Sequence, residues 1–537
     1  MKTQGPTATV FNHSYSHTQP GRETRIPKSM RRIVIVGGGT AGWMTAMIFA
    51  KALIAKGVEI TVLESPAVGI IGVGEGSTPW LRGFFDSLGI EESEWMPECN
   101  ATYKCGITFE GWSTRPGYKS YFHPFASMLD NLTMTQFVHN AHARLNGADV
   151  CALPNRFFIA SRLADKRMAP RPARHFPFDV WYGYHFDAVL VGQFLHRKAE
   201  ERGVKYKPCH VESVNLDERG DIASVRTREG ETIAADFFVD CSGFAGLLIQ
   251  KALGTPFVSF AENLFNDAAV ALPTSIDEDL PSQTVSIAMK HGWKWVIPLT
   301  SRYGNGYVYS SAFCSPDEAE RELRESLGML DDPTPARHLK MRIGRVTQHW
   351  NRNCLAVGLA QGFIEPLEAT ALLFIQRTAT AFVETLEAGD VGESARERLN
   401  ARINEHFEGT RDYIVTHYKT NSRNDTDYWR ACSANANLSD SLKELYSLWL
   451  SGRGILEPVA RQAIGKGYPV MSWYSIMAGM GCFPPQLRAP NGGEDRYDLD
   501  EIDNLLERSA MNFPAQKELV KAIPPKVREK SLQVYFW

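Results

Sequence analysis

The chain has 537 residues, so its length favours two or three units or one elaborated core. A formal net charge of -3 and a charged fraction of 22% leave no electrostatic case for binding nucleic acid or an anionic membrane. No apolar run reaches the roughly 18 residues that a membrane span needs. The nine cysteines are scattered without a metal-ligand spacing, which favours reduced thiols in a cytoplasmic protein that holds no metal.

The two ends of the chain differ from its middle. Residues 1–30 are polar and lack the apolar segment of a signal peptide, so we expect a disordered tail there. The last residues, 534–537, are unusually apolar for a free end, and we expect them to dock on the protein.

A nucleotide-binding signature directly follows the tail. The β-branched run 32–36 predicts a strand, and the sequence GGGTAG at 37–42 predicts a glycine-rich turn. The helical pattern over 43–56 predicts a helix. A second strand is expected over 58–63, ending at the acidic Glu64. This order of strand, glycine-rich turn, helix, strand and acid is typical of dinucleotide binding.

Each part of this signature has a physical role. Gly37 makes the tight turn, Gly39 lets the backbone approach a pyrophosphate, and Gly42 lets the helix and strand pack closely. Free N–H groups at the helix start face the phosphates, and Glu64 would accept a hydrogen bond from a ribose hydroxyl. The motif does not separate FAD from NAD, but a second fingerprint is missing from the sequence, which favours one dinucleotide.

Strands and helices alternate further along the chain. We expect a helix from Phe186 to Arg202, followed by strands at 211–216, 222–227 and 237–240. This order recurs in two-dinucleotide-domain flavoproteins of the hydroxylase type.

A later strand leads into a helix from Leu372 through a connection at Gly358 to Ala371, and in such folds this loop lies against the flavin ring. We therefore predict an α/β (α+β) fold of the flavin monooxygenase class. The first unit is a Rossmann-type FAD-binding module over residues 31–385, with inserted segments on the substrate side. The second is a mostly helical subdomain over residues 386–537 that docks on this module. The predicted cofactor-binding residues are Gly37, Gly39, Thr40, Ala41, Gly42, Glu64 and Gly358.

The hexapeptide from Trp293 to Pro298 carries two tryptophans one residue apart. On a strand, Trp293 and Trp295 would point to the same face. Each indole N–H needs a partner when it is buried. Together with the nucleotide signature, this unusual strand indicates that the chain belongs to a subset of flavoproteins that share one type of reaction.

From residue 31 to about 485 the chain resembles the flavin-dependent halogenase family, in its tryptophan halogenase branch. The hexapeptide is specific for halogenases among the flavin monooxygenase relatives. The matching motifs keep their order along the chain: GGGTAGWM at 37–44, GVGE at 72–75, FFDSLGI at 84–90, EWMP at 94–97, NATYK at 100–104, WKWVIP at 293–298, FIEPLE at 363–368 and SRNDT at 422–426.

The resemblance implies that reduced FAD, oxygen and a halide together yield hypohalous acid, which passes through a tunnel to a lysine. The family's lysine falls on Lys104 and its glutamate on Glu368. An ammonium can polarise hypohalous acid and a neutral amine could form a haloamine; either route benefits from a partly apolar pocket that lowers the lysine pKa. Glu368 would orient the acid and take the ring proton, which leaves Glu365 as the structural carboxylate.

The family's halide site maps to the backbone N–H groups of Thr370 and Ala371, just before a helix, where an anion is favoured. The family usually has Ser-Thr-Gly where this chain has Ala369-Thr370-Ala371. Ala371 keeps its N–H but restricts the backbone if φ is positive there. We therefore expect halide affinity, or the preference between chloride and bromide, to differ.

On the substrate side, His123 and Phe125 match two aromatic positions that sandwich an indole, and Trp473 falls near a third. The stretch 425–470 departs from the family and looks shorter, so indole or a related small aromatic is as well supported as free tryptophan. Trp293, Trp295 and Pro298 would wall the flavin chamber off from the substrate chamber.

Three other functions stay open: an aromatic flavin monooxygenase, a halogenase of a carrier-bound phenol or pyrrole, and a non-catalytic flavin-binding protein. The hexapeptide and Lys104 argue against the first, and Lys104 and Glu368 argue against the third. The resemblance implies a separate flavin reductase as partner and a small aromatic substrate, with the chain acting as a monomer or homodimer.

Overall fold

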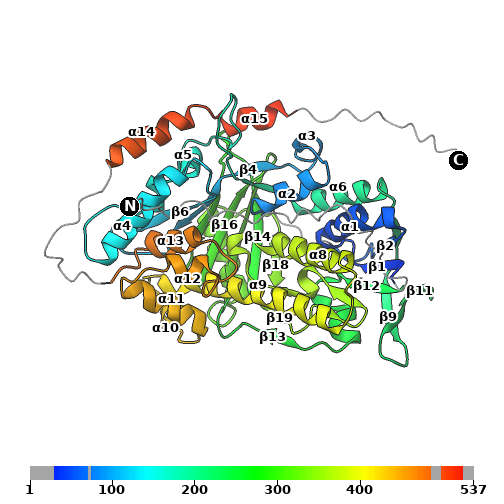
Figure 1. Ribbon diagram of the computed structural model, residues 1–537. Helices are drawn as coiled ribbons and strands as arrows, with labels where there is room; N and C mark the ends of the chain where they lie inside the picture. The colour runs from blue at the N-terminus through cyan, green and yellow to red at the C-terminus, as the bar shows by residue number, and fades with distance from the viewer. Residues whose placement is uncertain (1–29, 70–73, 485–497, 524–537) are drawn as a thin grey trace, which may run out of the picture.

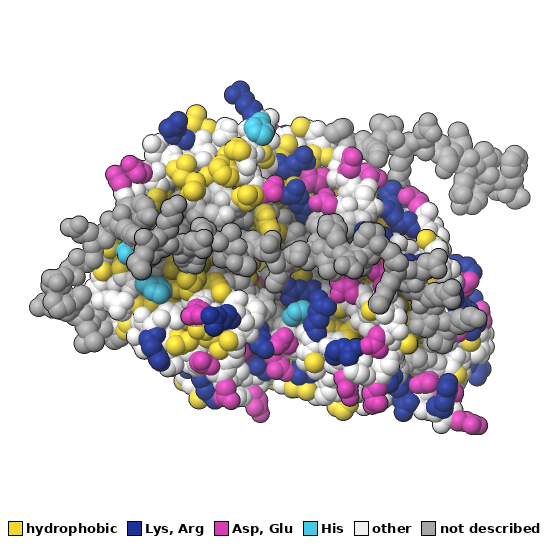
Figure 2. Space-filling model, in the orientation of Figure 1, with side chains coloured by type: hydrophobic (Ala, Val, Ile, Leu, Met, Phe, Trp, Pro, Cys, Tyr) yellow, Lys and Arg dark blue, Asp and Glu magenta, His cyan; other side chains and the backbone are white. Residues whose placement is uncertain are grey.

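The computed structural model describes residues 30–69, 74–484 and 498–523. The disordered tail predicted at 1–30, except for residue 30, and the apolar end at 534–537 lie outside these residues. Among the described helices, none combines the length and apolar character needed to cross a bilayer. Figure 2 shows acidic and basic side chains interspersed over the described part of one face of the molecule.

The nucleotide-binding signature forms the centre of a six-stranded sheet. Strand β1 lies parallel between β2 and β12, and each of its four buried positions pairs in register with both neighbours. In order across the sheet the strands are β20 (Trp350–Asn351), β21 (Cys354–Ala356), β12 (Phe237–Asp240), β1 (Arg32–Val36), β2 (Glu59–Glu64) and β8 (Lys205–Pro208). The strands predicted at the start of the chain are confirmed.

A seven-stranded sheet carries the tryptophan hexapeptide. Its order is β18 (Arg337–Lys340), β14 (Ala268–Thr274), β17 (Tyr303–Tyr309), β16 (Gly292–Pro298), β15 (Thr284–Ala288), β5 (Gly106–Glu110) and β6 (Ser120–Pro124). Strand β16, which holds both tryptophans, is central, and β6, which holds His123, is at one edge. One continuous sheet therefore connects the hexapeptide to a predicted substrate-side residue.

Three small sheets complete the strand structure. The first contains β3 (Gly74–Gly76), β7 (Gly183–Asp187) and β4 (Thr102–Lys104), and it carries Lys104. The second is the predicted meander, β9 (Val211–Leu216), β10 (Ile222–Thr227) and β11 (Thr232–Ala234). The third contains β13 (Phe257–Ser259), β19 (Gly344–Val346) and β22 (Gly362–Phe363).

Helices pack around these sheets, and Figure 1 shows α1 and α6 beside the nucleotide-binding sheet, with α10 to α13 gathered at the opposite side. The helices of the first part of the chain are α1 (Thr40–Leu53), α2 (Trp80–Ser87), α3 (Glu92–Trp95), α4 (Asn131–Leu145), α5 (Ile159–Asp165), α6 (Ala188–Glu200) and α7 (Pro316–Leu327). Those of the second part are α8 (Ala371–Glu387), α9 (Glu393–Thr420), α10 (Asp427–Ala434), α11 (Asp440–Leu450), α12 (Leu456–Ala460), α13 (Val470–Gly479), α14 (Leu499–Ala510) and α15 (Gln516–Ala522). The predicted helical character after residue 386 is confirmed, while the division into two units stays a prediction.

One predicted boundary was wrong. The helix expected from Phe186 begins at Ala188, because Phe186 belongs to β7 and pairs with Glu75 of β3. Asp187 ends the strand and caps the helix, since its side chain accepts hydrogen bonds from the N–H groups of Val189 and Leu190.

Candidate active site

The glycine-rich turn at the start of α1 has the geometry that a dinucleotide needs. Gly37 has φ +118°, and a Cβ there would lie 2.2 Å from the carbonyl oxygen of Cys241. A Cβ on Gly42 would lie 1.9 Å from the Gly37 carbonyl oxygen, so helix and strand pack closely, as predicted. By contrast, a Cβ on Gly39 would meet nothing within 4 Å, and α1 has no side-chain cap at its N-terminus. This leaves open space and unsatisfied N–H groups beside Thr40.

Two further predicted cofactor residues lie at the same turn. Glu64 ends β2 beside Gly38, and burial raises its pKa. Gly358 has φ +69°, and a Cβ there would lie 2.6 Å from the Cβ of Ala41. The loop after β21 therefore touches the start of α1, and the residues present fit a bound dinucleotide.

Lys104 is fully buried at the end of β4, where it pairs with Gly183 of β7. Its Nζ has no hydrogen-bond partner among the described residues and lies 5.5 Å from the ring centroid of Phe125. Burial lowers the pKa of Lys104 to about 7, although the charge of Glu368 acts in the opposite direction. Lys104 thus lies in a partly apolar pocket and burial lowers its pKa, while its catalytic role stays a prediction.

Glu368 ends a short 3₁₀ helix, η6 (Pro366–Glu368), and its carboxylate lies between two imidazoles. Oε2 is 3.1 Å from Nδ1 of His123, and Oε1 is 2.9 Å from Nε2 of His417. Burial on its own would raise the pKa of Glu368, but His123 and then His417 outweigh it and lower the pKa to about 2. The carboxylate is therefore ionised in the folded chain.

Glu365, three residues earlier, has a different environment. Its Oε2 accepts hydrogen bonds from Nε1 of Trp293 at 2.9 Å, Nδ2 of Asn266 at 2.9 Å and the hydroxyl of Tyr418 at 2.7 Å. Burial raises its pKa, and these three donors only partly offset that effect. Through these hydrogen bonds Glu365 connects β16, the segment before β14, and α9, and its structural role stays a prediction.

The two tryptophans lie on the same face of β16, as predicted. They are nearly fully buried, and their ring centroids are 6.2 Å apart. Gly306 of β17 is paired with Trp295, and a Cβ at that glycine would lie 2.0 Å from the indole ring. At the end of the strand, the carbonyl oxygen of Pro298 accepts a 2.8 Å hydrogen bond from Thr102, two residues before Lys104. The hexapeptide is thus anchored at both ends to the segments that carry Glu365 and Lys104.

The loop predicted to bind halide differs from expectation in its backbone. The positive φ falls on Ala369, at +56°, and not on Ala371, which is the first residue of α8. Thr370 precedes it with φ -91°, and α8 has no side-chain cap. The N–H groups of residues 370 and 371 therefore lie at a helix N-terminus, and alanine at 371 imposes no strain because its backbone is helical. Strain falls on residue 369.

The predicted substrate-side residues are only partly brought together. His123 contacts Glu368, and Phe125 lies near Lys104. Trp473 is fully buried and donates its indole N–H to the Gly465 carbonyl oxygen at 2.9 Å. It meets Tyr413 edge-on with ring centroids 4.9 Å apart, and Tyr413 lies between it and His123, whose ring centroid is 6.1 Å from that of Tyr413.

Sequence reasoning missed three residues of this site. His417 and Tyr413 lie one turn apart on α9, and His185 lies on β7, where burial and the charge of Lys104 hold its pKa well below the usual range. The spacing of four between Tyr413 and His417 places them on one helix face and continues the stripe of Leu399, Ile403 and Phe407. That spacing was available in the sequence, but it does not reveal the contact with Glu368.

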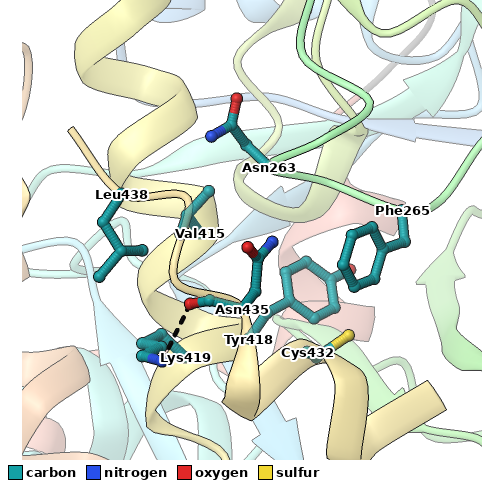
Figure 3. A pocket seen from close by; sticks show the side chains of 8 residues that line it. All are labelled: Asn263, Phe265, Val415, Tyr418, Lys419, Cys432, Asn435 and Leu438. Atoms are coloured by element: carbon teal, nitrogen blue, oxygen red, sulfur yellow. Dashed lines mark hydrogen bonds between the residues drawn. The ribbon is translucent and has the colours of Figure 1, made fainter. Parts of the chain in front are cut away.

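A small pocket at the junction of α9 and α10 contains none of the predicted site residues. Figure 3 shows its lining side chains, with Lys419 donating a 2.9 Å hydrogen bond to the backbone oxygen of Asn435. The lining residues are Asn263, Phe265, Val415, Tyr418, Lys419, Cys432, Asn435 and Leu438.

One group of possible metal ligands occurs among the described residues: His291, Cys314 and Glu322. Nδ1 of His291 lies 4.0 Å from Glu322, wider than the roughly 3.3 Å between ligands of a tetrahedral zinc ion. Glu322 also accepts a hydrogen bond from the N–H of Lys290. The expectation that the chain holds no metal stays a prediction.

The fold and the site define a class of protein: flavoproteins in which a dinucleotide module is joined to a buried lysine and an ionised glutamate. The family model described as tryptophan halogenase matches residues 32–491. The chain belongs to this family of flavin-dependent halogenases.

Similar proteins carry the same description. The tryptophan 6-halogenase SttH of Streptomyces toxytricini is 39% identical over 482 residues, covering 84% of this chain and 89% of the relative. The tryptophan 7-halogenase RebH of Lentzea aerocolonigenes is 34% identical over 523 residues, covering 92% and 97%. A tryptophan halogenase structure from Shewanella frigidimarina matches with a TM-score of 0.81 at 29% identity, covering 94% of this chain and 100% of that one.

Proposed function

We propose that this enzyme halogenates a free, electron-rich aromatic ring, indole or tryptophan, with Lys104 activating the halogen and Glu368 acting as base. One observation carries the proposal: a fully buried lysine without a hydrogen-bond partner shares a site with a carboxylate that is held ionised. An uncompensated buried lysine is costly and marks a functional site.

The cofactor fits the turn at the start of α1. The N–H groups beside Thr40 and the open space at Gly39 would take the pyrophosphate, and Glu64 would bind the ribose. When bound in its reduced form, FAD supplies electrons to oxygen, which allows a halide to be oxidised to hypohalous acid. The N–H groups of Thr370 and Ala371 would hold that halide.

The remaining steps belong to side chains of this protein. Lys104 would hold hypohalous acid by a hydrogen bond and polarise its halogen, or exchange with it to form a haloamine. The aromatic ring attacks the halogen, the carbon–halogen bond forms, and the bond from halogen to oxygen or nitrogen breaks. Glu368 then takes the proton from the substituted carbon. Its low pKa ensures that it is deprotonated before the ring reacts.

The relatives support an indole ring as the substrate. They are named as 6- and 7-halogenases of tryptophan and have similar sequence identity to this chain. They therefore support an indole ring as the substrate, and the carbon that is halogenated has to be measured. His123 and Phe125, beside Glu368 and Lys104, would sandwich that ring, with Trp473 behind Tyr413. Trp293, Trp295 and Pro298 would separate it from the flavin. A separate reductase, a monomer or homodimer, and a cytoplasmic location stay predictions.

A panel of free aromatics tests the proposal. Each is incubated with the enzyme, a flavin reductase, oxygen and either chloride or bromide, and products are identified by mass. We expect halogenated indole or tryptophan that depends on the halide. Hydroxylated product without halogen would instead favour a monooxygenase, and reaction only with a carrier-bound phenol or pyrrole would favour that class of halogenase.

A further inference from the structure

His417 lies on α9 in a fully buried position, directly against Glu368. Its ring packs among aromatic side chains, with centroids 4.7 Å from Phe109 and 6.0 Å from Trp112. Nε2 lies 2.9 Å from Oε1 of Glu368, off the line of a regular hydrogen bond. No motif of the family resemblance includes this residue.

The other ring nitrogen shows how His417 must be protonated. Nδ1 lies 3.2 Å from the backbone carbonyl oxygen of Tyr413, one helical turn earlier. A carbonyl oxygen only accepts hydrogen bonds, so Nδ1 carries a proton. A neutral ring would then turn the lone pair of Nε2 toward the carboxylate, which is repulsive. The 2.9 Å contact is therefore favourable only when a proton lies between Nε2 and Oε1. With that proton on Nε2, His417 is an imidazolium paired with the carboxylate.

His123 does not have the same requirement. Its Nδ1 can donate to Glu368 in the neutral form, because Nε2 then faces the hydroxyl of Tyr413, 3.4 Å away. That hydroxyl can act as a donor to it, or donate instead to the Ser472 carbonyl oxygen at 3.0 Å. The two imidazoles thus differ in geometry: His123 can donate to Glu368 as a neutral ring, whereas the contact of His417 needs a proton on Nε2 in addition to the one on Nδ1.

We infer that His417 is a positioning residue for Glu368, which it holds as an oriented carboxylate through an imidazolium contact at Oε1. The inference rests on the proposed role of Glu368 as base. It deepens that role, because a buried carboxylate without a cationic partner takes up a proton and cannot accept one from the ring.

The titratable groups around this contact come from several elements, and His417 is the one that contacts Oε1. Three buried tyrosines feel the charge of Glu368, and burial keeps them neutral by raising their pKa values. Lys104 acts on Glu368 through space and is partly neutral near pH 7. The groups that face Glu368 or His417 are His123 and Tyr121 from β6, Lys104 from β4, Tyr413 from α9, and Tyr468 from the segment before α13.

Two substitutions of His417 separate charge from shape. His417→Phe keeps a buried ring without a donor, and His417→Gln offers a neutral N–H donor. In the phenylalanine variant, Glu368 should protonate on acidification within the working range, so that the acidic limb of kcat moves up by roughly two pH units or more. KM should change little, and His417→Gln should fall between wild type and His417→Phe.

His349→Phe provides a matched control. It removes an equally buried imidazole, which contacts Asn404 and stacks on Phe407, away from Glu368. It should leave the acidic limb where it is. If His417 only fills space, His417→Phe would lower the melting temperature without moving the pH profile, and the inference would be overturned.

Infrared difference spectra give a readout that does not need turnover. On acidification, the carbonyl band of a protonated carboxyl should appear in His417→Phe at a pH roughly two units or more above wild type, and it should disappear when Glu368→Gln is added. A band that appears at the same pH in His417→Phe and wild type would overturn the inference. If wild type forms no halogenated product, the proposed function fails while this test of His417 still stands. If His417→Phe does not fold, the test uses His417→Gln and the ring ¹⁵N chemical shifts of His417 in the wild type. Those shifts should be the shifts of an imidazolium, and the shifts of a neutral ring would contradict the inference.

Discussion

Trp293 donates its indole N–H to the carboxylate of Glu365 across a distance of 2.9 Å. Glu365 lies three residues before Glu368 in the sequence. A single short segment thus carries the carboxylate that anchors the tryptophan strand and the carboxylate proposed as base. Burial raises the pKa of the first, and flanking imidazoles lower that of the second against burial. This segment therefore joins the proposed partition to the proposed reaction site.

Removing the tryptophan pair should open the proposed partition. In a Trp293→Ala, Trp295→Ala variant the two buried indoles are replaced by a cavity between the flavin side and the substrate side. We expect hydroxylated aromatic to appear beside halogenated product, as measured by mass spectrometry. Trp293→Phe keeps most of the volume and serves as the control. A double variant whose products match those of wild type would rule out a partition.

Exchanging the two glutamates for glutamine should give opposite results. Glu368→Gln cannot accept the ring proton, so turnover should fall by roughly 100-fold or more. Glu365→Gln keeps an oxygen for the Trp293 N–H, so turnover should stay within about threefold of wild type. Steady-state rates of halogenated product measure both. A severe loss in Glu365→Gln together with an unaffected Glu368→Gln would reverse their roles.

Lys104 should make folding stability depend on pH. Its folded pKa, about 7, lies below the unfolded value of 10.5, so the unfolded chain binds more protons between these limits. Below pH 7 the full cost of burying the charge is present, on the order of 5 kcal/mol. That cost declines as pH rises from 7 to 10.5. Urea unfolding should find Lys104→Met more stable than wild type at neutral pH, with a gap that narrows toward pH 10.5; a constant gap would disprove the shifted pKa.

The altered halide loop allows a paired test. Ala369 has φ +56°, so Ala369→Gly should increase the free energy of unfolding by about 1 kcal/mol. Ala371→Gly, at the first position of α8, should give no gain and a loss of up to about 1 kcal/mol. Chemical denaturation measures both, and product yields in chloride and bromide report the halide preference. A gain from Ala371→Gly alone would mean that the backbone assignment is wrong.

The sequence predicts the local features of this protein well. The glycine turn, the acid at the end of β2 and the shared face of Trp293 and Trp295 follow from spacing alone, because backbone geometry dictates them. Lys104 and Glu368 are reached only through the family resemblance. The motifs predict which residue types occupy these positions. The distances between the side chains and their protonation states depend on how distant segments pack.

Contacts between distant segments could not be predicted. His417 is 49 positions beyond Glu368 in the sequence, and the packing of α9 against η6 brings the two together. The helix start at Ala188 was misjudged because pairing of β7 with β3 and β4 overrides the local helical pattern. The positive φ at Ala369 depends on how η6 joins α8, which a comparison of residue types does not reveal.

The account depends most on Lys104, and one measurement tests it directly. Wild type and Lys104→Ala are compared for brominated tryptophan formation with the same reductase, oxygen and bromide, while FAD binding is followed by fluorescence. The account predicts a product with the bromine isotope pattern from wild type, and loss of product in the variant with FAD binding retained. Brominated product at the wild-type rate from Lys104→Ala would contradict it.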